Sequence, residues 1–152
     1  MRKKGRKENN GGTTIATAKR SSTGPRPVAW FEIVGANGEG LRSFYSRLFG
    51  WETTEVAPGT KYGVMDAAPH GVGGGVGPSQ KGPGHVTVFV EVDDLEEALE
   101  NAERLGGKTI AGPIQFPDKR PSARGKGSVS FAYFADPEGH LIGLCHGIVR
   151  QS

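Results

Sequence analysis

The chain has 152 residues, 35% of them hydrophobic and 25 of them glycine, which allows one domain or two small modules that share a core. The formal net charge of +3 is unevenly placed, because residues 1–26 hold eight of the 19 Lys and Arg residues and one of the 16 acidic residues. The remainder is therefore mildly acidic, which argues against nucleic-acid binding by the folded part.

Two further classes of protein are excluded by simple counts. The single cysteine, Cys145, cannot form an intramolecular disulfide. No apolar run reaches the length of a membrane span, and residues 13–18 are too short and too polar for the core of a signal peptide. We therefore expect a cytoplasmic protein with neither a membrane nor a nucleic acid as its partner.

The first 26 residues are predicted to be a disordered basic tail, since they offer little that a core would bury. Such a tail is either a weak tether for an anionic surface or a plain extension, and we favour the extension. The domain then covers residues 27–148, as two modules over 27–77 and 84–148.

The first module reads as strand, helix and three strands. Residues 28–34 alternate as a strand does, and apolar residues in 39–49 recur at helical spacing until Gly50 ends the helix. Further strands are predicted over 51–56, 61–66 and 72–76. The last lies in the glycine-rich run 71–77, which lacks the Lys-Ser/Thr helix of a phosphate loop, so these glycines are expected to admit a ligand or a neighbouring strand.

The second module repeats this order after a linker over 78–84. A strand is predicted over 85–91, and a helix over 95–105 is capped by Asp93 or Asp94. A strand over 108–116, a basic loop over 117–126 and a strand over 127–135 follow. The chain then turns at 136–139, where Asp-Pro-Glu-Gly is typical of a tight turn, into a last strand that begins at 141.

Two such βαβββ modules predict an α+β fold, an eight-stranded half-open barrel around a cleft. The first strand of each module has an apolar face, which we expect a helix to cover. These outer residues are Phe31 and Ile33, and Val86, Val88 and Val90. The opposite faces, with Trp30, Glu32, His85, Thr87 and Glu91, are free to line a concavity, and a concave surface is the usual place for a small ligand.

Three segments resemble the vicinal oxygen chelate superfamily, which includes glyoxalase I, bleomycin- and fosfomycin-resistance proteins and extradiol dioxygenases. They are WFEIVGANGEGLRSFYSRLFGWE (30–52), GHVTVFVEVDDLEEALENAERLGGK (84–108) and FADPEGHLIGL (134–144). The resemblance covers about residues 27–148. It implies the half-open barrel and a homodimer, but it leaves the reaction open, because one fold carries many functions.

In the metal-using members, the first and last strands of each module supply the ligands. Of the four matching positions, only His85 carries a ligand side chain. Trp30 and Gly143 stand at two others, and the glycine-rich run supplies no acid. Since catalytic sites usually need about three protein ligands, we expect no metal cofactor. A Zn, Ni, Mn or Fe centre that recruits Glu32, Glu91 or Cys145 is the less favoured alternative.

The candidate ligand-binding residues are Trp30, Glu32, His85, Thr87, Phe89 and Cys145. Trp30 is either a stacking wall or core filler. His85 and Glu32 are also candidates for acid–base catalysis, with a structural histidine and a simple ion pair as the alternatives. Cys145 is expected to be a buried, inert thiol. The basic loop 118–126 either attracts an anionic ligand or is merely solvated.

Our first hypothesis is a metal-independent protein that binds an unidentified small molecule, as in the bleomycin-resistance branch. The second is a glyoxalase- or dioxygenase-like enzyme, a lyase or oxidoreductase, that uses His85 and Glu32. The third is an interaction protein that acts through its tail. Whether the protein is an enzyme stays open at this point.

Overall fold

The structure, a computed structural model, describes residues 24–67, 71–120, 123 and 127–149. The predicted tail lies outside the described residues up to position 23. Within the described part of the chain, no helix is long and apolar enough to cross a membrane.

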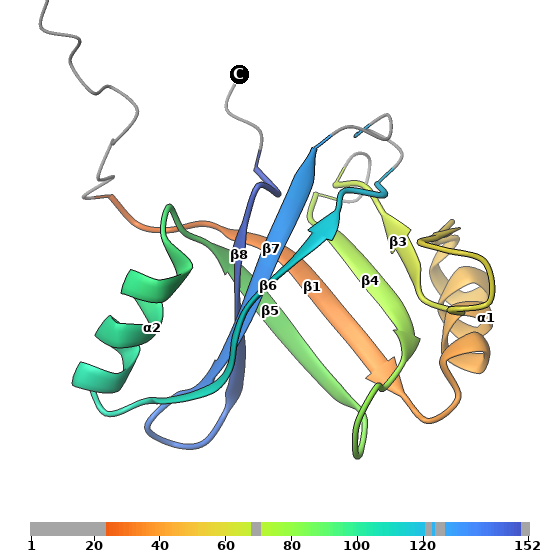
Figure 1. The fold of residues 1–152 in the computed structure, drawn as a ribbon. Coiled ribbons are helices and arrows are strands. Elements are labelled where there is room, and N and C mark those ends of the chain that lie inside the picture. The colour runs from red at the N-terminus through yellow and green to blue at the C-terminus, as the bar shows by residue number, and fades with distance from the viewer. Residues whose placement is uncertain (1–23, 68–70, 121–122, 124–126, 150–152) are drawn as a thin grey trace, which may run out of the picture.

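One mixed sheet of eight strands forms the body of the protein, in the order β2-β3-β4-β1-β5-β8-β7-β6. It curls into a half-barrel, with one helix on either side (Figure 1), and confirms the predicted α+β class. The elements are β1 (Val28–Gly35), α1 (Gly38–Phe49), β2 (Thr54–Glu55), β3 (Gly63–Met65), β4 (Gly73–Pro78), β5 (His85–Glu91), α2 (Leu95–Arg104), β6 (Lys108–Pro117), β7 (Ser128–Ala135) and β8 (Leu141–His146).

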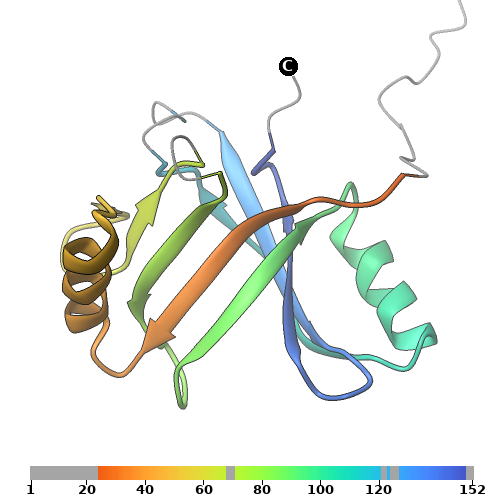
Figure 2. The same cartoon turned by 180° about the vertical axis from the view of Figure 1, so that it is seen from behind.

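The first strands of the two modules meet at the centre of the sheet. β1 and β5 pair antiparallel, with Glu32 opposite Thr87 and Trp30 opposite Phe89, and they run side by side between the two helices in Figure 2. β1 pairs in parallel with β4, and β5 pairs in parallel with β8. Each module thus repeats the same local arrangement, as the internal repeat predicts.

Both helices begin and end as their sequences indicate. The Asn37 side chain accepts a hydrogen bond from the Gly40 amide at the start of α1, and Gly50 ends that helix with φ 70°. Asp94, rather than Asp93, caps α2 by accepting from the Glu97 amide.

The glycine-rich strand β4 lies against large side chains of its neighbours. A Cβ on Gly74 would lie 2.2 Å from the Phe31 ring, and one on Gly75 would lie 1.9 Å from the Tyr62 hydroxyl. The expected close approach is thus confirmed for neighbouring residues, because only glycine leaves room for these two rings.

Two features differ from the prediction. β2 spans two residues rather than 51–56, because the Trp51 ring packs into the cluster of Phe31, Tyr45 and Phe49 on the outer face. The prediction that a helix covers the apolar face of β5 is wrong for the first half of this strand, where Val86 is 72% and Val88 is 39% exposed. The reason is that α2 packs through residues such as Leu95 and Leu99 against β6, β7 and β8.

Candidate functional site

Glu32 is the centre of a polar cluster on the concave face of the sheet. Its Oε2 accepts a hydrogen bond from the Tyr62 hydroxyl at 2.7 Å, and its Oε1 accepts from the Tyr133 hydroxyl at 3.1 Å. His85 Nε2 lies 2.9 Å from the same Oε1. These side chains come from β1, from the residue before β3, from β7 and from the start of β5, so the curl of the sheet assembles them.

The two tyrosines of this cluster keep their protons. Burial, and next the charge of Glu32, raise the pKa of Tyr62 well above 10.0, and the same two causes raise the pKa of Tyr133. Both phenols are therefore donors to the Glu32 carboxylate. The Glu32 side chain is 13% exposed and that of His85 is 30% exposed, so the imidazole is nearer to solvent than the carboxylate.

The middle of the concave face is packed rather than open. Trp30, Phe89 and Cys145 belong to one buried cluster, with Phe89 only 1% exposed. Thr87 is also buried, and its hydroxyl donates to the Leu141 carbonyl oxygen at 2.6 Å. Three of the six candidate ligand-binding residues, Thr87, Phe89 and Cys145, are thus core residues, whereas Glu32 and His85 form the polar cluster described above and Trp30 also borders the cavity described next.

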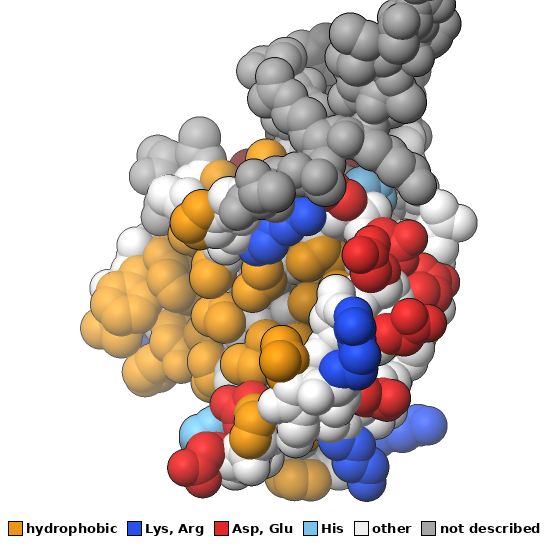
Figure 3. Space-filling view, turned by 90° about the vertical axis from the view of Figure 1, so that its left-hand side faces the viewer, with side chains coloured by type: hydrophobic (Ala, Val, Ile, Leu, Met, Phe, Trp, Pro, Cys, Tyr) orange, Lys and Arg blue, Asp and Glu red, His pale blue; other side chains and the backbone are white. Residues whose placement is uncertain are grey.

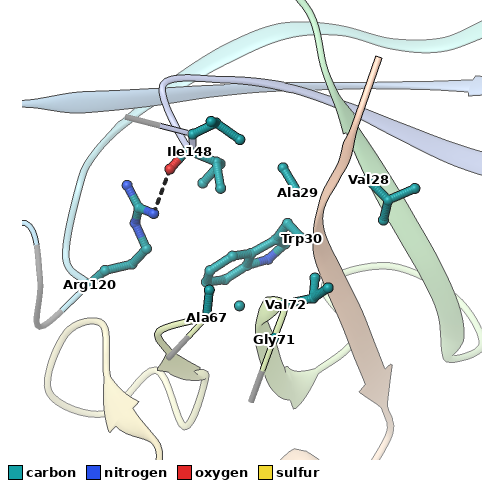
Figure 4. A pocket seen from close by; sticks show the side chains of 10 residues that line it. Val28, Ala29, Trp30, Ala67, Gly71, Val72, Arg120 and Ile148 are labelled. Carbon is teal, nitrogen blue, oxygen red and sulfur yellow. Dashed lines mark hydrogen bonds between the residues drawn. The ribbon is translucent and has the colours of Figure 1, made fainter. Parts of the chain in front are cut away.

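A cavity of about 250 Å³ lies at the other end of the concave face, where β1 begins. Trp30 stands in its middle, and Arg120 faces it from the opposite wall (Figure 4). The rest of the lining is aliphatic or glycine, supplied by the start of β1, the flanks of the loop before β4 and the chain after β8. The lining residues are Val28, Ala29, Trp30, Ala67, Gly71, Val72, Gly73, Arg120, Ile148 and Val149.

The positive charge at this cavity is already engaged. Arg120 binds Asp118 through Nε–Oδ1 and Nη2–Oδ2 contacts of 3.0 and 2.7 Å. Its guanidinium also donates to the carbonyl oxygens of Ile148 and Gly147, so it fastens the segment that forms one wall. Of the predicted basic loop, residues 121–122 and 124–126 lie outside the described part, as does His70.

Glu91 binds the segment 147–149, which Arg120 also holds, through the backbone amides of that segment. Its carboxylate accepts hydrogen bonds from the amides of Gly147, Ile148 and Val149 at 2.7, 3.1 and 3.4 Å. Cys145 Sγ donates to Glu91 Oε2 at 3.4 Å. Burial, and next the Glu91 charge, raise the pKa of the Cys145 thiol, which is buried as predicted and is held in its unreactive form.

The metal that the resemblance implies does not fit the residues present. A Cβ on Gly143 would lie 2.2 Å from the Phe89 ring, so an aromatic side chain fills the space of the expected carboxylate. The glycine-rich run of the first module offers no acid, the Tyr62 hydroxyl lies 1.9 Å from where a Cβ on Gly75 would stand, and His85 Nε2 is turned to Glu32. Among the described residues, no group of three or more His, Cys, Asp and Glu side chains is arranged to hold a metal ion.

Sequence reasoning missed the two tyrosines of the cluster. The sequence analysis placed Tyr133 within the predicted strand 127–135 and Tyr62 within the predicted strand 61–66, and gave neither a role in the site. The available signal was alternation: Tyr133 stands opposite Gly143, which stands opposite the inward-facing Phe89. Tyr62 gave no such signal, because its ring reaches Glu32 across a strand of glycines.

Comparison with known proteins settles the family. Residues 33–145 match the family model described as Glyoxalase-like domain. The chain belongs to this glyoxalase-like family, within the vicinal oxygen chelate superfamily. Two curated relatives, each named "Putative glyoxylase CFP32", from Mycobacterium bovis and Mycobacterium tuberculosis, are 30% identical over 128 residues. The match covers 82% of this chain and 45% of theirs, so the chain spans about half the length of these relatives.

Solved structures share the fold of this glyoxalase-like chain. The hypothetical protein BH1468 from Bacillus halodurans has a TM-score of 0.56 at 16% identity, covering 85% of this chain and 99% of that one. A glyoxalase/bleomycin resistance protein/dioxygenase superfamily member from Vibrio splendidus has 0.52 at 14%, covering 80% and 99%. A methylmalonyl-CoA epimerase variant from Streptomyces coelicolor has 0.53 at 14%, covering 83% and 97%. At these identities the likeness concerns the fold alone.

Proposed function

We propose that this glyoxalase-like protein binds a flat, largely apolar small molecule in the cavity at Trp30, without a protein-bound metal. The observation that carries the proposal is the lining of the cavity, where an indole and aliphatic side chains enclose about 250 Å³. Such a lining binds through apolar contact and ring stacking, with few polar groups to fix orientation. Because Arg120 is paired with Asp118, a formal negative charge on the ligand is not required.

Metal independence is supported by side chains that occupy the family's ligand positions. Phe89 lies over Gly143, and Trp30 stands where the first module would supply a ligand. The energy of binding would then come from burial of apolar surface, at roughly 25 cal/mol per Å².

A ligand screen on metal-depleted protein tests this proposal. At a ligand concentration about tenfold above Kd, binding adds roughly 1.4 kcal/mol to stability, which a thermal melt detects. The Val72→Phe variant, which fills the cavity, should lose the shift, whereas Ile110→Phe on the exposed part of β6 should keep it. A shift that persists in Val72→Phe, or one that appears only when Zn, Ni, Mn or Fe is restored, would contradict the proposal.

We also propose that the protein is a homodimer that buries the outer face of β1 and β5. Ring contacts run from Phe44 on α1 through Tyr45 and Trp51 to Phe31 on β1. Val88, which is partly exposed, stands opposite Phe31 in the register. The outer face is therefore one continuous apolar surface. Figure 3 shows, on the side of the molecule that carries α2, an area of hydrophobic side chains beside a band of acidic ones.

The exposed apolar side chains of this face supply part of the area that a stable dimer buries. Five of its large side chains are 39–72% exposed, and since a fully buried aromatic side chain covers roughly 150–250 Å², the five contribute on the order of 500 Å². A stable dimer needs about 800 Å² per partner. A two-fold contact joins a patch to itself, and an uncharged patch does not repel its copy. The five are Phe44, Leu48, Phe49, Val86 and Val88.

An enzyme is the alternative function, and the contact between Glu32 and His85 favours it. These two candidate catalytic residues lie within hydrogen-bond distance at one end of the concave face, which suits acid–base chemistry of the lyase or oxidoreductase kind without a family metal.

A further inference from the structure

The direction of each hydrogen bond around Glu32 determines where the protons lie. Tyr62 and Tyr133 approach the carboxylate through hydroxyl groups, one on each oxygen. A phenol that faces a carboxylate donates to it, and the pKa of each phenol is raised by burial and by the charge of Glu32. Both oxygens of Glu32 are therefore engaged as acceptors of phenol hydrogen bonds.

The tautomer of His85 follows from this inventory. Because Glu32 only accepts, the Nε2 atom that lies 2.9 Å from Oε1 must carry a hydrogen. In the neutral imidazole the other nitrogen, Nδ1, then holds the free electron pair. The His85 side chain is 30% exposed while that of Glu32 is 13% exposed, so the imidazole stands between the buried carboxylate and the outside.

We propose that His85 is a general base that takes a proton through Nδ1 from a small carbon acid bound at this end of the cleft. Glu32 is the positioning residue, because its contact of 2.9 Å with Nε2 fixes the imidazole. Tyr62 and Tyr133 in turn hold Glu32 in place. This inference deepens the alternative function and does not depend on the cavity at Trp30, so either proposal can fail without the other.

The chain supplies a matched control for this pair. His140 lies 2.9 Å from Asp136, as close as His85 is to Glu32, but its side chain is 72% exposed and it stands in the turn before β8. It is therefore a histidine–carboxylate pair without tyrosine donors and without a wall around it. If any histidine beside a carboxylate could act as the base, His140 would contribute to the rate as much as His85 does.

A test reaction of known stoichiometry measures the proposed base. In 5-nitrobenzisoxazole a base removes the C3 proton, the C–H electron pair forms the second π bond of a nitrile, and the N–O bond breaks to give a phenolate. No oxidant or reductant is needed. The reaction should be saturable, and the His85→Gln variant should lose on the order of 10²-fold in kcat. The His140→Gln variant should keep the full rate.

Nitrogen NMR of the histidine rings tests the positioning role directly. The wild-type protein should show His85 as the Nε2–H tautomer when neutral. The Glu32→Gln variant should lose this preference and about tenfold in kcat at unchanged KM. Tyr133→Phe should keep the tautomer.

Three results would overturn the proposal. They are an Nδ1–H tautomer in the wild-type protein, a His85→Gln rate equal to that of the wild type, and an equal loss in His140→Gln. Circular dichroism of each variant ensures that a lost rate is not a lost fold.

Discussion

Replacing Gly143 with alanine probes the packing that stands where the superfamily would place a carboxylate. The added Cβ would lie 2.2, 2.4 and 2.5 Å from three atoms of the Phe89 ring. That ring has little freedom to move, since it is 1% exposed and its centroid lies 5.3 Å from those of Phe131 and Tyr133. Overpacking of a core costs about 1–3 kcal/mol, so we expect Gly143→Ala to destabilise the fold by this amount.

Chemical denaturation of Gly143→Ala measures the loss as a change in the free energy of unfolding. Gly112→Ala is the control, because a Cβ there meets no atom within 4 Å, and its stability should change by no more than about 0.5 kcal/mol. Adding Phe89→Leu to Gly143→Ala should recover part of the loss by making room for the methyl group. Wild-type stability in Gly143→Ala would refute the view that Phe89 fills this position.

Three further predictions concern the assembly, the pH dependence and a helix cap. The Val86→Glu variant should be a monomer in analytical ultracentrifugation, whereas the Leu105→Glu variant, changed at the end of α2, should stay a dimer. If Val86→Glu is as dimeric as the wild-type protein, the proposed dimer face is wrong. Folding raises the pKa values of Tyr62 and Cys145, so their contribution to the stability of the fold is complete below pH 9.0 and is lost as pH rises through 10.0 and beyond. The free energy of unfolding should therefore fall over this pH range. It should fall less in the Tyr62→Phe variant. Asp94→Ala should cost about 1 kcal/mol in the same assay, since the Glu97 amide loses its cap, and an unchanged value would show that water replaces it.

The sequence alone predicted the fold because its signals are local. Strand alternation, helical spacing, the Gly50 stop and the turn at 136–139 each depend on a few neighbouring residues, and the repeat of the module gave the architecture. All eight strands and both helices lie where they were expected, apart from element ends. The shortening of β2 is one such case, because a contact of the Trp51 ring with α1 decided it.

The site was less predictable, since it depends on distances between strands. Alternation correctly placed Glu32 and His85 on one face, but it could not tell a lined cavity from a packed core. Phe89 and Cys145, which alternation also placed on this face, belong to the packed core that fills the middle of the concave face. The partner of Glu32 from the first module, Tyr62, reaches it only because β4 has glycine where its ring lies. Likewise, periodicity did not reveal that α2 leaves Val86 exposed.

The central claim, that a small molecule binds at Trp30 without a metal, is tested most directly by fluorescence. The chain has two tryptophans, so Trp51→Phe leaves Trp30 as the only indole. Titration of this variant with aromatic compounds in the presence of a chelator should give a saturable change in Trp30 emission, and Val72→Phe should abolish it. A Trp30 signal that stays constant for every compound whose binding raises Tm, or one that appears only when a divalent metal is added, would contradict the account.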